Sequence, residues 1–524
     1  MGQQKKQIIV LSVTLMILLS GSIIASLFFK ESWLWMDEVL SYLLVSDPSV
    51  AHLNDAVVSG MDANPPLFVN LYWFIGHTIS MNPQFLRAVS VVIFAGTIAL
   101  FYRNTSTLIG KPITNFVFIT LIVAFTYLNL TLSTQIRGYS LFLLISLGYF
   151  MVLHRLMQSP SQTKWLIGFV LLGILLVFTH NFGLFYAASS GAFVAGLLLW
   201  SKNRKYWWVL GAHGLIALIW LLVWYPSFAI QTEAGKPHSW IPLPTFLSFF
   251  ATVGELAPTV SSTLERRIPV ISILRFLLIA GLWLYIALPR LRAGYEQVIH
   301  DRAFTFYVLS GFLYIVPILI ALAVTLVHTS VFISRYLWPG HLLLIYQLLY
   351  AFYFFAPRLP ARVRQFTLSV KLLPVYMALL AVFMFYQNRK TAIFPSGVLS
   401  YLPQLDKQYP VFVETADYFL PIWFHHQTPQ IRYLLDWKTA SQEGNILNAT
   451  VHHKILKSVR EKYGVGNILP SQGFNRTSVP HFYVIDESSN YQIEHFIENG
   501  QVRVVRQLPI NIEGHRILEC VFQS

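Results

Sequence analysis

The sequence predicts a polytopic α-helical membrane protein that carries a small α/β domain at its carboxy-terminal end. Hydrophobic residues make up 55% and charged residues 11% of the 524 residues, whereas about 25% of the residues in a soluble domain are charged. Long apolar runs recur as far as residue 388, and the chain becomes polar after about residue 389. A chain of this composition cannot bury its apolar surface in water, so we expect the apolar part to lie in a membrane.

Apolar runs of a length that suits a hydrocarbon core of about 30 Å recur about eleven times. The predicted spans are 7–29, 83–102, 113–131, 139–155, 165–180, 182–200, 206–225, 268–288, 303–327, 336–356 and 370–388. A further run, 67–80, has about 14 residues and would extend only roughly 21 Å as a helix. We therefore expect it to lie along or dip into the membrane surface.

The distribution of charges predicts the orientation of these spans. With the amino terminus inside, most Lys and Arg residues fall in the cytoplasmic connections and most acids fall outside. About eleven spans then place the carboxy-terminal domain outside the cytoplasm. The net charge of +14 thus reflects helix orientation and does not indicate a nucleic-acid partner. The single cysteine, Cys520, excludes an internal disulfide framework and a cysteine-based metal site.

Two domains follow from this pattern. Residues 1–389 form the predicted transmembrane domain, with large external loops at about 30–82 and 226–267. Residues 390–524 form the predicted extracytoplasmic α/β domain. In the first loop, 50–61 approximates the stripe of an interfacial helix. In the carboxy-terminal domain the pattern predicts strands at 410–414, 431–435, 481–485, 502–505 and 516–521, and helices at 449–463 and 491–498.

Acidic residues mark the first external loop. Asp37 and Glu38 are adjacent carboxylates that directly follow the first span, flanked by tryptophans that suit a membrane interface. The simpler interpretation of this stretch is a solvated loop with an aromatic anchor. Asp62 follows in the same loop, and Asn64 can cap a helix whose first turn contains Pro65 and Pro66. A plain helix start explains the prolines but not Asp62.

Arginines mark two other external connections. Arg137 lies with Gln135 and Tyr139 in the short turn between the third and fourth spans, and Arg335 precedes Tyr336 at the external end of the tenth. A guanidinium group at that depth is unfavourable unless it meets an anion. Both arginines are therefore candidate phosphate-binding groups.

A histidine completes the set of polar residues on this face. His180 and Asn181 lie at the external end of the fifth span, where a lone histidine is more commonly an interfacial residue than a ligand. Its position becomes informative because the candidate acids and arginines named above are predicted to lie on the same side of the membrane as this histidine. Such a set suits chemistry on a lipid-linked phosphate.

The order of these pieces resembles the polytopic GT-C glycosyltransferases. It looks most like the branch that contains protein O-mannosyltransferases and bacterial aminoarabinose transferases, which is a family 39-like branch. The matching pieces are Asp37–Glu38, Asn64–Leu67, Gln135–Tyr139, Thr179–His180 and Arg335–Leu337. They occur in order over residues 1 to about 390, and five of them on one face are more specific than any alone.

The resemblance implies an integral protein of a bacterial plasma membrane that transfers a sugar from a polyprenyl-phosphate donor, with inversion, to a lipid, glycan or protein acceptor. Asp37 would be the catalytic base with Glu38 beside it. Arg137 and Arg335, with His180, would bind the donor phosphate. The chain departs from relatives at Asn64, where the aminoarabinose branch has Lys, and at Gln135, where many have Glu.

Other functions remain open at this point. A membrane transporter or flippase would show charged or broken helices near the bilayer midplane, and the predicted helix interiors carry few charges. A scaffold that binds a partner through its carboxy-terminal domain leaves the acids and arginines unexplained. Within enzymes, a ligase that transfers a whole glycan from a lipid pyrophosphate is the main alternative. The sequence implies no metal, although some relatives in the wider superfamily need a divalent cation.

Overall fold

The structure is a computed structural model of the 524-residue chain. It describes residues 2–29, 33–234, 239–259, 268–358, 372–390, 401–426, 428, 430–442, 449–486, 492–509 and 515–523. Parts of both predicted external loops and the start of the last predicted span lie outside the described residues, as do residues 391–400, which follow the predicted domain boundary between 389 and 390.

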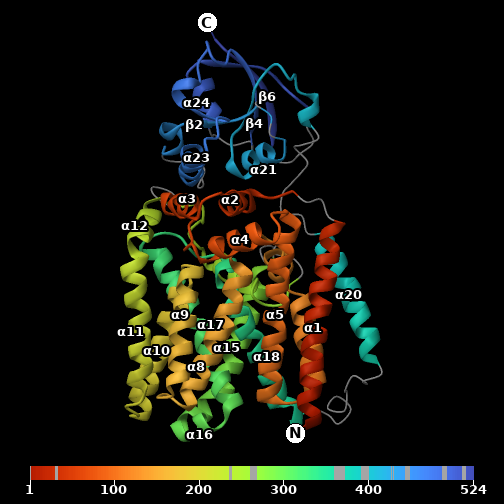
Figure 1. The fold of residues 1–524 in the computed structure, drawn as a ribbon, viewed down its shortest axis with the longest axis vertical. Coiled ribbons are helices and arrows are strands. Elements are labelled where there is room, and N and C mark those ends of the chain that lie inside the picture. Colours follow the sequence, from red (N-terminus) through yellow and green to blue (C-terminus); the bar gives the residue numbers. More distant parts are fainter. Residues whose placement is uncertain are drawn as a thin grey trace.

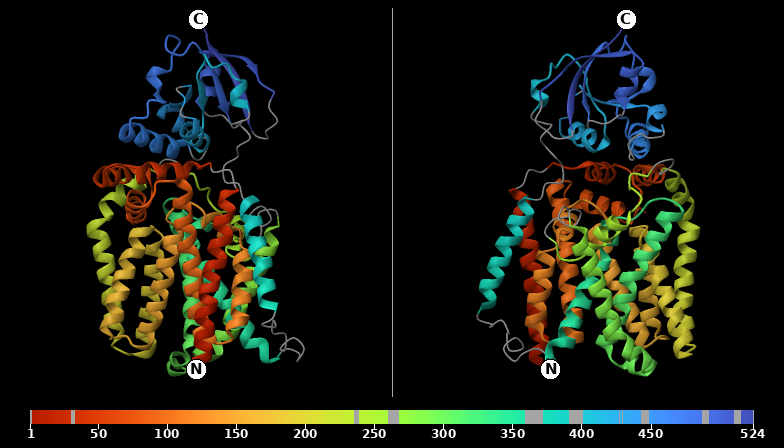
Figure 2. Two further views of the ribbon diagram at one scale, coloured as in Figure 1. Left: turned by 45° about the vertical axis from the view of Figure 1, so that its right-hand side comes forward. Right: turned by 180° about the vertical axis from the view of Figure 1, so that it is seen from behind.

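Long helices run side by side to form a bundle (Figures 1 and 2). They are α1 (Gly2–Phe28), α5 (Pro83–Ile109), α6 (Pro112–Ala124), α8 (Tyr139–Gln158), α9 (Thr163–Thr179), α10 (Gly183–Ser201), α11 (Tyr206–Val223), α15 (Pro269–Arg292), α17 (Arg302–Val327), α18 (Pro339–Phe355) and α20 (Leu373–Lys390). Shorter helices, α7 (Tyr127–Leu132), α12 (Tyr225–Ala234), α13 (Phe246–Gly254) and α16 (Tyr295–His300), connect them.

Seven of these helices are long and apolar enough to cross a membrane: α1, α5, α8, α10, α11, α15 and α17. The helices α6, α9 and α18 are apolar but shorter. Large apolar side chains project outward from the bundle, and Leu274, Leu277 and Leu278 on α15 are each about 60% exposed. Apolar surface of this kind is unfavourable in water by roughly 25 cal/mol per Å². The fold is thus that of a helical membrane protein, and the total of about eleven spans remains a prediction.

The predicted span 113–131 is wrong as a single helix, because the chain breaks between α6 and α7. The backbone nitrogen of Tyr127 donates to the carbonyl of Thr259 at 2.6 Å instead of continuing the helical ladder. The side chain of Asn129 donates to the carbonyl of Val123 at 3.1 Å. These contacts satisfy backbone groups that the break would otherwise leave without partners in an apolar environment.

A layer of short helices covers one end of the bundle (Figure 1). It consists of α2 (Met36–Val45), α3 (Val50–Ala56), the π-helix η1 (Val57–Met61) and α4 (Leu67–Thr78), and we call it the cap layer. The expected helices at 50–61 and 67–80 are therefore present. Asn54 of α3 and Asn70 of α4 exchange side-chain hydrogen bonds of 2.9 and 3.1 Å, which tie the layer together.

The carboxy-terminal residues form a six-stranded mixed sheet with helices on its faces, stacked on the cap layer (Figures 1 and 2). The strand order is β3-β2-β1-β4-β6-β5, parallel from β3 to β4 and antiparallel from β4 to β5. The strands are β1 (Val411–Val413), β2 (Ile431–Leu435), β3 (Ile468–Pro470), β4 (His481–Asp486), β5 (Val502–Gln507) and β6 (Arg516–Phe522). The helices are α21 (Ala416–His426), α22 (Trp437–Ala440), α23 (Ala449–Tyr463) and α24 (Gln492–Glu498).

The five predicted strands and two predicted helices of this domain are all present, and β2 and α23 have the predicted bounds. The sequence did not predict β3, α21 or α22. Short 3₁₀ helices complete the fold: η2 (Ser334–Leu337), η3 (Ala356–Arg358) and η6 (Ser471–Gly473). Cys520 lies on β6, fully buried, and burial raises the pKa of its thiol to about 12.

Candidate functional site

The candidate site lies at the end of the bundle that faces the carboxy-terminal domain. Helix α2 begins at Met36, and the extended backbone of Trp35 turns the chain into it. Asp37 and Glu38 therefore occupy the first turn of α2, where carboxylates are favoured by the free N–H groups and the positive end of the helix dipole. Side chains of adjacent residues in a helix diverge by about 100°, so the two acids face different surroundings.

Asp37 faces two guanidinium groups. Its Oδ2 lies 3.6 Å from Nη1 of Arg335 and 4.0 Å from Nε of Arg137. Arg137 also donates to the hydroxyl of Ser41, one turn further along α2, at 3.1 Å. The side chain of Asp37 is 17% exposed and that of Arg335 is 19% exposed. The structure thus brings together three residues that are about 300 positions apart at most, and it leaves their charged atoms partly accessible.

Asp62 forms the tightest contact of the cluster, with its Oδ2 at 2.9 Å from Nη1 of Arg137. Burial lowers the pKa of Arg137, but the carboxylates of Asp62 and Asp37 outweigh it and raise that pKa above its ordinary value. Arg137 is therefore a permanent cation. The cluster formed by Asp37, Asp62, Arg137 and Arg335 is close to neutral overall.

Asn64 does not cap a helix, in contrast to our prediction. Helix α4 begins at Leu67 after Pro66, without a side-chain cap. Pro65 and Pro66 precede the helix and do not form its first turn, so Asn64 lies too far from the free N–H groups of α4 to cap them. Its backbone and side-chain nitrogens instead donate to Oδ1 of Asp62, at 3.0 and 3.3 Å. Asn64 therefore holds Asp62 in place.

Aromatic rings surround Arg335. Its guanidinium carbon lies 4.7 Å from the ring centre of Trp240, 5.4 Å from that of Tyr336 and 6.0 Å from that of Trp35. Cation–π contacts of this kind fix a guanidinium group without neutralising it. Nε of Arg335 is buried and has no hydrogen-bond partner among the described residues. Arg335 is thus a fixed cation with an available donor.

His180 is buried beside the arginines, in the turn between α9 and α10. Burial, followed by the charges of Arg137 and Arg335, lowers the pKa of His180 to about 3. Its Nδ1 accepts a hydrogen bond from the backbone nitrogen of Phe182 at 3.1 Å, so the neutral ring carries its proton on Nε2. Nε2 has no partner among the described residues. His180 is therefore a neutral hydrogen-bond donor and adds no positive charge to the predicted phosphate site.

A small cavity of about 10 Å³ lies between these groups, which is roughly the space of one water molecule. Its lining includes Asp62, Asn64, Arg137, Tyr139 and His180. Residues from three separate stretches of the sequence, namely the first external loop, the turn before α8 and the end of α9, thus line one cavity.

The remaining predicted site residues lie around the cluster. Gln135 and Tyr139 are buried, and Oε1 of the former and the hydroxyl of the latter have no hydrogen-bond partner among the described residues. Asn181 donates to the carbonyl of Ala63 at 2.7 Å and so connects the turn between α9 and α10 to the segment between η1 and α4. The ring of Tyr336 lies 5.0 Å from that of His180. Gln135 and Tyr139 therefore offer unused polar atoms, and Asn181 combines a structural contact through Nδ2 with an Oδ1 that has no partner among the described residues.

Glu38 does not share the surroundings of Asp37. Its side chain is fully buried, and its two oxygens accept from Nε and Nη2 of Arg87 at 2.8 and 2.5 Å. The backbone nitrogen of Ile136 donates to the same carboxylate at 3.0 Å. A buried bidentate pair leaves no oxygen free to take a proton from a substrate. We therefore assign Glu38 a structural role in place of the expected catalytic one.

Sequence reasoning missed several residues of this region. Arg87 is the only Lys, Arg, Asp or Glu in the predicted span 83–102, which is a signal for a buried partner. Trp240 and Ser41 carried no such signal, because their roles depend on contacts between distant segments. Ser334, next to Arg335, donates to Glu255 at 2.5 Å, a contact that also requires the fold.

The carboxylates of the cluster face guanidinium groups. Among the described residues, no group of three or more His, Cys, Asp and Glu side chains is arranged to hold a metal ion. This donor set does not fit a divalent cation, and we derive no step through one.

No family model matches the chain, and no curated protein sequence matches it.

Proposed function

We propose that this protein transfers a sugar from a polyprenyl-phosphate donor to an acceptor hydroxyl, at the membrane face that the carboxy-terminal domain covers. One observation carries the proposal. A partly exposed carboxylate, Asp37, lies between two fixed cations, Arg137 and Arg335, at the end of an apolar helix bundle. A donor with a lipid tail keeps that tail in the bilayer and presents its phosphate at this depth.

Asp37 suits the role of general base. Its contacts with the two guanidinium groups are 3.6 and 4.0 Å long, so its carboxylate is oriented but retains lone pairs for a substrate hydroxyl. The acceptor O–H would give its proton to Asp37 as the oxygen attacks the anomeric carbon. The bond between that carbon and the phosphate oxygen breaks, and the electron pair leaves with the polyprenyl phosphate. Attack opposite to the leaving group inverts the anomeric centre.

The arginines suit the leaving group. Negative charge develops on the phosphate as it departs, and preorganised cations stabilise it without further rearrangement. Nε of Arg335 has no partner among the described residues, and Arg137 is a charged group that Asp62 holds. The Nε2–H of His180 is a further donor beside Arg137. The cations and the base thus lie close enough to act on one glycosyl phosphate.

The test is a transfer assay with the purified full chain. It would be incubated with a panel of polyprenyl-phosphate sugars and with lipid, glycan and peptide acceptors, and released polyprenyl phosphate would be measured. We expect release from at least one donor with the parent protein and none with Asp37→Asn. Release that is equal in both proteins would remove Asp37 from the mechanism, and no release from any donor would contradict the proposed function.

The same assay separates this function from transport. A flippase moves the intact donor across a bilayer, so the bond between sugar and phosphate survives. A ligase releases polyprenyl pyrophosphate when offered a lipid-pyrophosphate glycan. Donors of both phosphate classes, assayed in vesicles with analysis of the lipid product, therefore assign the protein to one of the three classes.

A further inference from the structure

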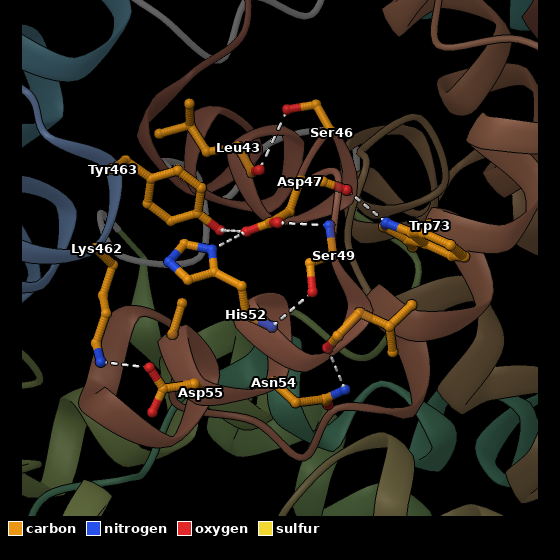
Figure 3. Close-up of polar contacts among 12 residues, drawn as sticks. Leu43, Ser46, Asp47, Ser49, His52, Asn54, Asp55, Trp73, Lys462 and Tyr463 are labelled. Atoms are coloured by element: carbon orange, nitrogen blue, oxygen red, sulfur yellow. Dashed lines mark hydrogen bonds and ion pairs between the residues drawn. The ribbon is translucent and has the colours of Figure 1, made fainter.

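The carboxy-terminal domain is attached to the cap layer by specific polar contacts (Figure 3). The hydroxyl of Tyr463, at the end of α23, donates to Oδ2 of Asp47 at 2.9 Å. His52 of α3 contacts the same carboxylate oxygen. The neighbouring Lys462 forms an ion pair with Asp55 of α3. The domain thus meets α3 and the turn before it through one end of α23.

Asp47 is a fixed anchor for these contacts. Its other carboxylate oxygen accepts from the backbone nitrogen of Ser49 at 2.9 Å, and its side chain is fully buried. Its carbonyl accepts from Nε1 of Trp73 on α4 at 2.6 Å (Figure 3). The contact with Tyr463 therefore joins the domain to a rigid point of the cap layer.

A second contact of α23 reaches the π-helix η1. The hydroxyl of Ser458 donates to the carbonyl of Ser59 at 3.0 Å, and Ser458 is buried. The next residue, Gly60, has a φ of 98°, which favours glycine. Single π-turns are rare and recur at functional sites. Segment η1 is thus an irregular element, held on one side by the carboxy-terminal domain.

The carboxy-terminal end of η1 connects directly to the candidate site. Asp62 follows η1, and its carboxylate pairs with Arg137. The buried amide of Gln231, on α12, donates to the carbonyls of Val57 and Asp62 at 3.0 and 2.9 Å and spans the segment from end to end. The position of Asp62 therefore depends on both Gln231 and the contact of Ser59 with the domain.

We propose that the carboxy-terminal domain is a positioning element of the active site and that Ser458 and Gln231 act through η1 on the pair formed by Asp62 and Arg137. This inference rests on the proposed function, because it assigns to Arg137 the donor phosphate. Loss of either contact lets η1 shift, so that Asp62 no longer holds Arg137 in the geometry that meets the phosphate. The base Asp37 lies on α2, and its link to η1 runs through Arg137, whose Nε lies 4.0 Å from Oδ2 of Asp37.

The expected result is a loss of kcat/KM for the lipid donor, because Arg137 meets the donor phosphate in the bound state and again as the phosphate departs. In Ser458→Ala and in Gln231→Met, this ratio should fall about three- to tenfold, which corresponds to one lost hydrogen bond. Ser458→Thr, which keeps the hydroxyl, should restore the parent value. The matched control is Lys457→Ala, because Lys457 lies next to Ser458 on α23, is 55% exposed and pairs only with Glu461 among the described residues.

Equal kcat/KM values for the lipid donor in Ser458→Ala, Gln231→Met and Lys457→Ala, with an active parent protein, would overturn the inference and leave the proposed function intact.

A second measurement does not depend on catalysis. Amide hydrogen exchange of residues 57–64 should become faster in Ser458→Ala and Gln231→Met and stay at the parent rate in Lys457→Ala. If the parent protein showed no transfer, the proposed function would fail, and the exchange experiment would still decide whether the domain holds η1. Unchanged exchange in both variants would refute that coupling.

Discussion

Two acid–arginine pairs lie side by side at the start of α2 and differ in almost every physical respect. Glu38 and Arg87 form a bidentate pair with short contacts and no exposed carboxylate. Asp37 meets Arg137 and Arg335 across longer distances, and its side chain is 17% exposed. Carboxylates of adjacent residues thus have different roles. The ion pair of Glu38 fixes α2 to α5, whereas Asp37 belongs to a partly exposed site.

The difference teaches which observation separates structure from function here. In a buried ion pair the two charged groups satisfy each other's hydrogen bonds. Separating them to admit a third group would leave a buried charge without a partner, which is unfavourable. A site must retain unused donors and acceptors. Among the described residues, Nε of Arg335 and Nε2 of His180 are such atoms. Both belong to the cluster around Asp37 and not to the pair formed by Glu38 and Arg87.

The largest expected effect tests the open pair. Asp37→Asn should lower the transfer rate about 10²- to 10⁴-fold, because a general base contributes about that much, and thermal unfolding in detergent should not change. Glu296→Gln is the control, since Glu296 lies on α16 at the opposite end of the bundle and its side chain is 75% exposed. A variant of Asp37 that unfolds at a lower temperature while keeping its activity would reverse the roles of the two acids.

The next effect tests the buried pair. Glu38→Gln should reduce the free energy of unfolding by about 3–5 kcal/mol, because it leaves the guanidinium of Arg87 buried without a counter-charge. Replacement of both residues by Met should recover most of this loss, whereas no double substitution of Asp37 and Arg137 should recover activity. The measurement is unfolding in detergent, followed by the intrinsic fluorescence of tryptophan. An unchanged free energy of unfolding in Glu38→Gln would contradict the structural assignment.

A smaller effect concerns the phosphate. Arg137→Ala should weaken the binding of polyprenyl phosphate about 10- to 150-fold, which corresponds to about 1.5–3 kcal/mol for a charge-assisted hydrogen bond. Arg137→Lys keeps the charge but loses the planar fork, so it should give an intermediate value. Equilibrium binding of polyprenyl phosphate to the purified protein measures both. An unchanged dissociation constant in Arg137→Ala would exclude this residue from the donor site.

The smallest effect sharpens the role of His180. Because its pKa is lowered to about 3, His180 stays neutral above about pH 5, and His180→Gln should have the pH–rate profile of the parent between pH 5.5 and 8.5. The unfolded chain gains this proton near pH 6.5. Its contribution to stability is therefore complete above that value and decreases as the pH falls toward 3. A parent profile with a rate change near pH 6.5 that His180→Gln abolishes would show that this histidine titrates.

Much of the fold was predictable because membrane helices and amphipathic elements leave periodic signals. The run 449–463 alternates apolar and polar residues at helical spacing, and α23 has those bounds. The break between α6 and α7 was not predictable, because it depends on a contact with Thr259 more than 120 residues away. Within the site, residue type and side of the membrane identified Asp37, Arg137 and Arg335. The division of labour between Asp37 and Glu38 required three-dimensional contacts.

The burial of Cys520 has a practical consequence for deciding which compartment each end of the bundle faces. A thiol reacts with maleimides as its thiolate, and this one is inaccessible and has a pKa of about 12. The folded natural chain should therefore not react with membrane-impermeant thiol reagents. Single cysteines introduced at Ser59 and at Ser159, which ends α8 at the opposite end of the bundle, would report their sides in intact cells without prior removal of native thiols.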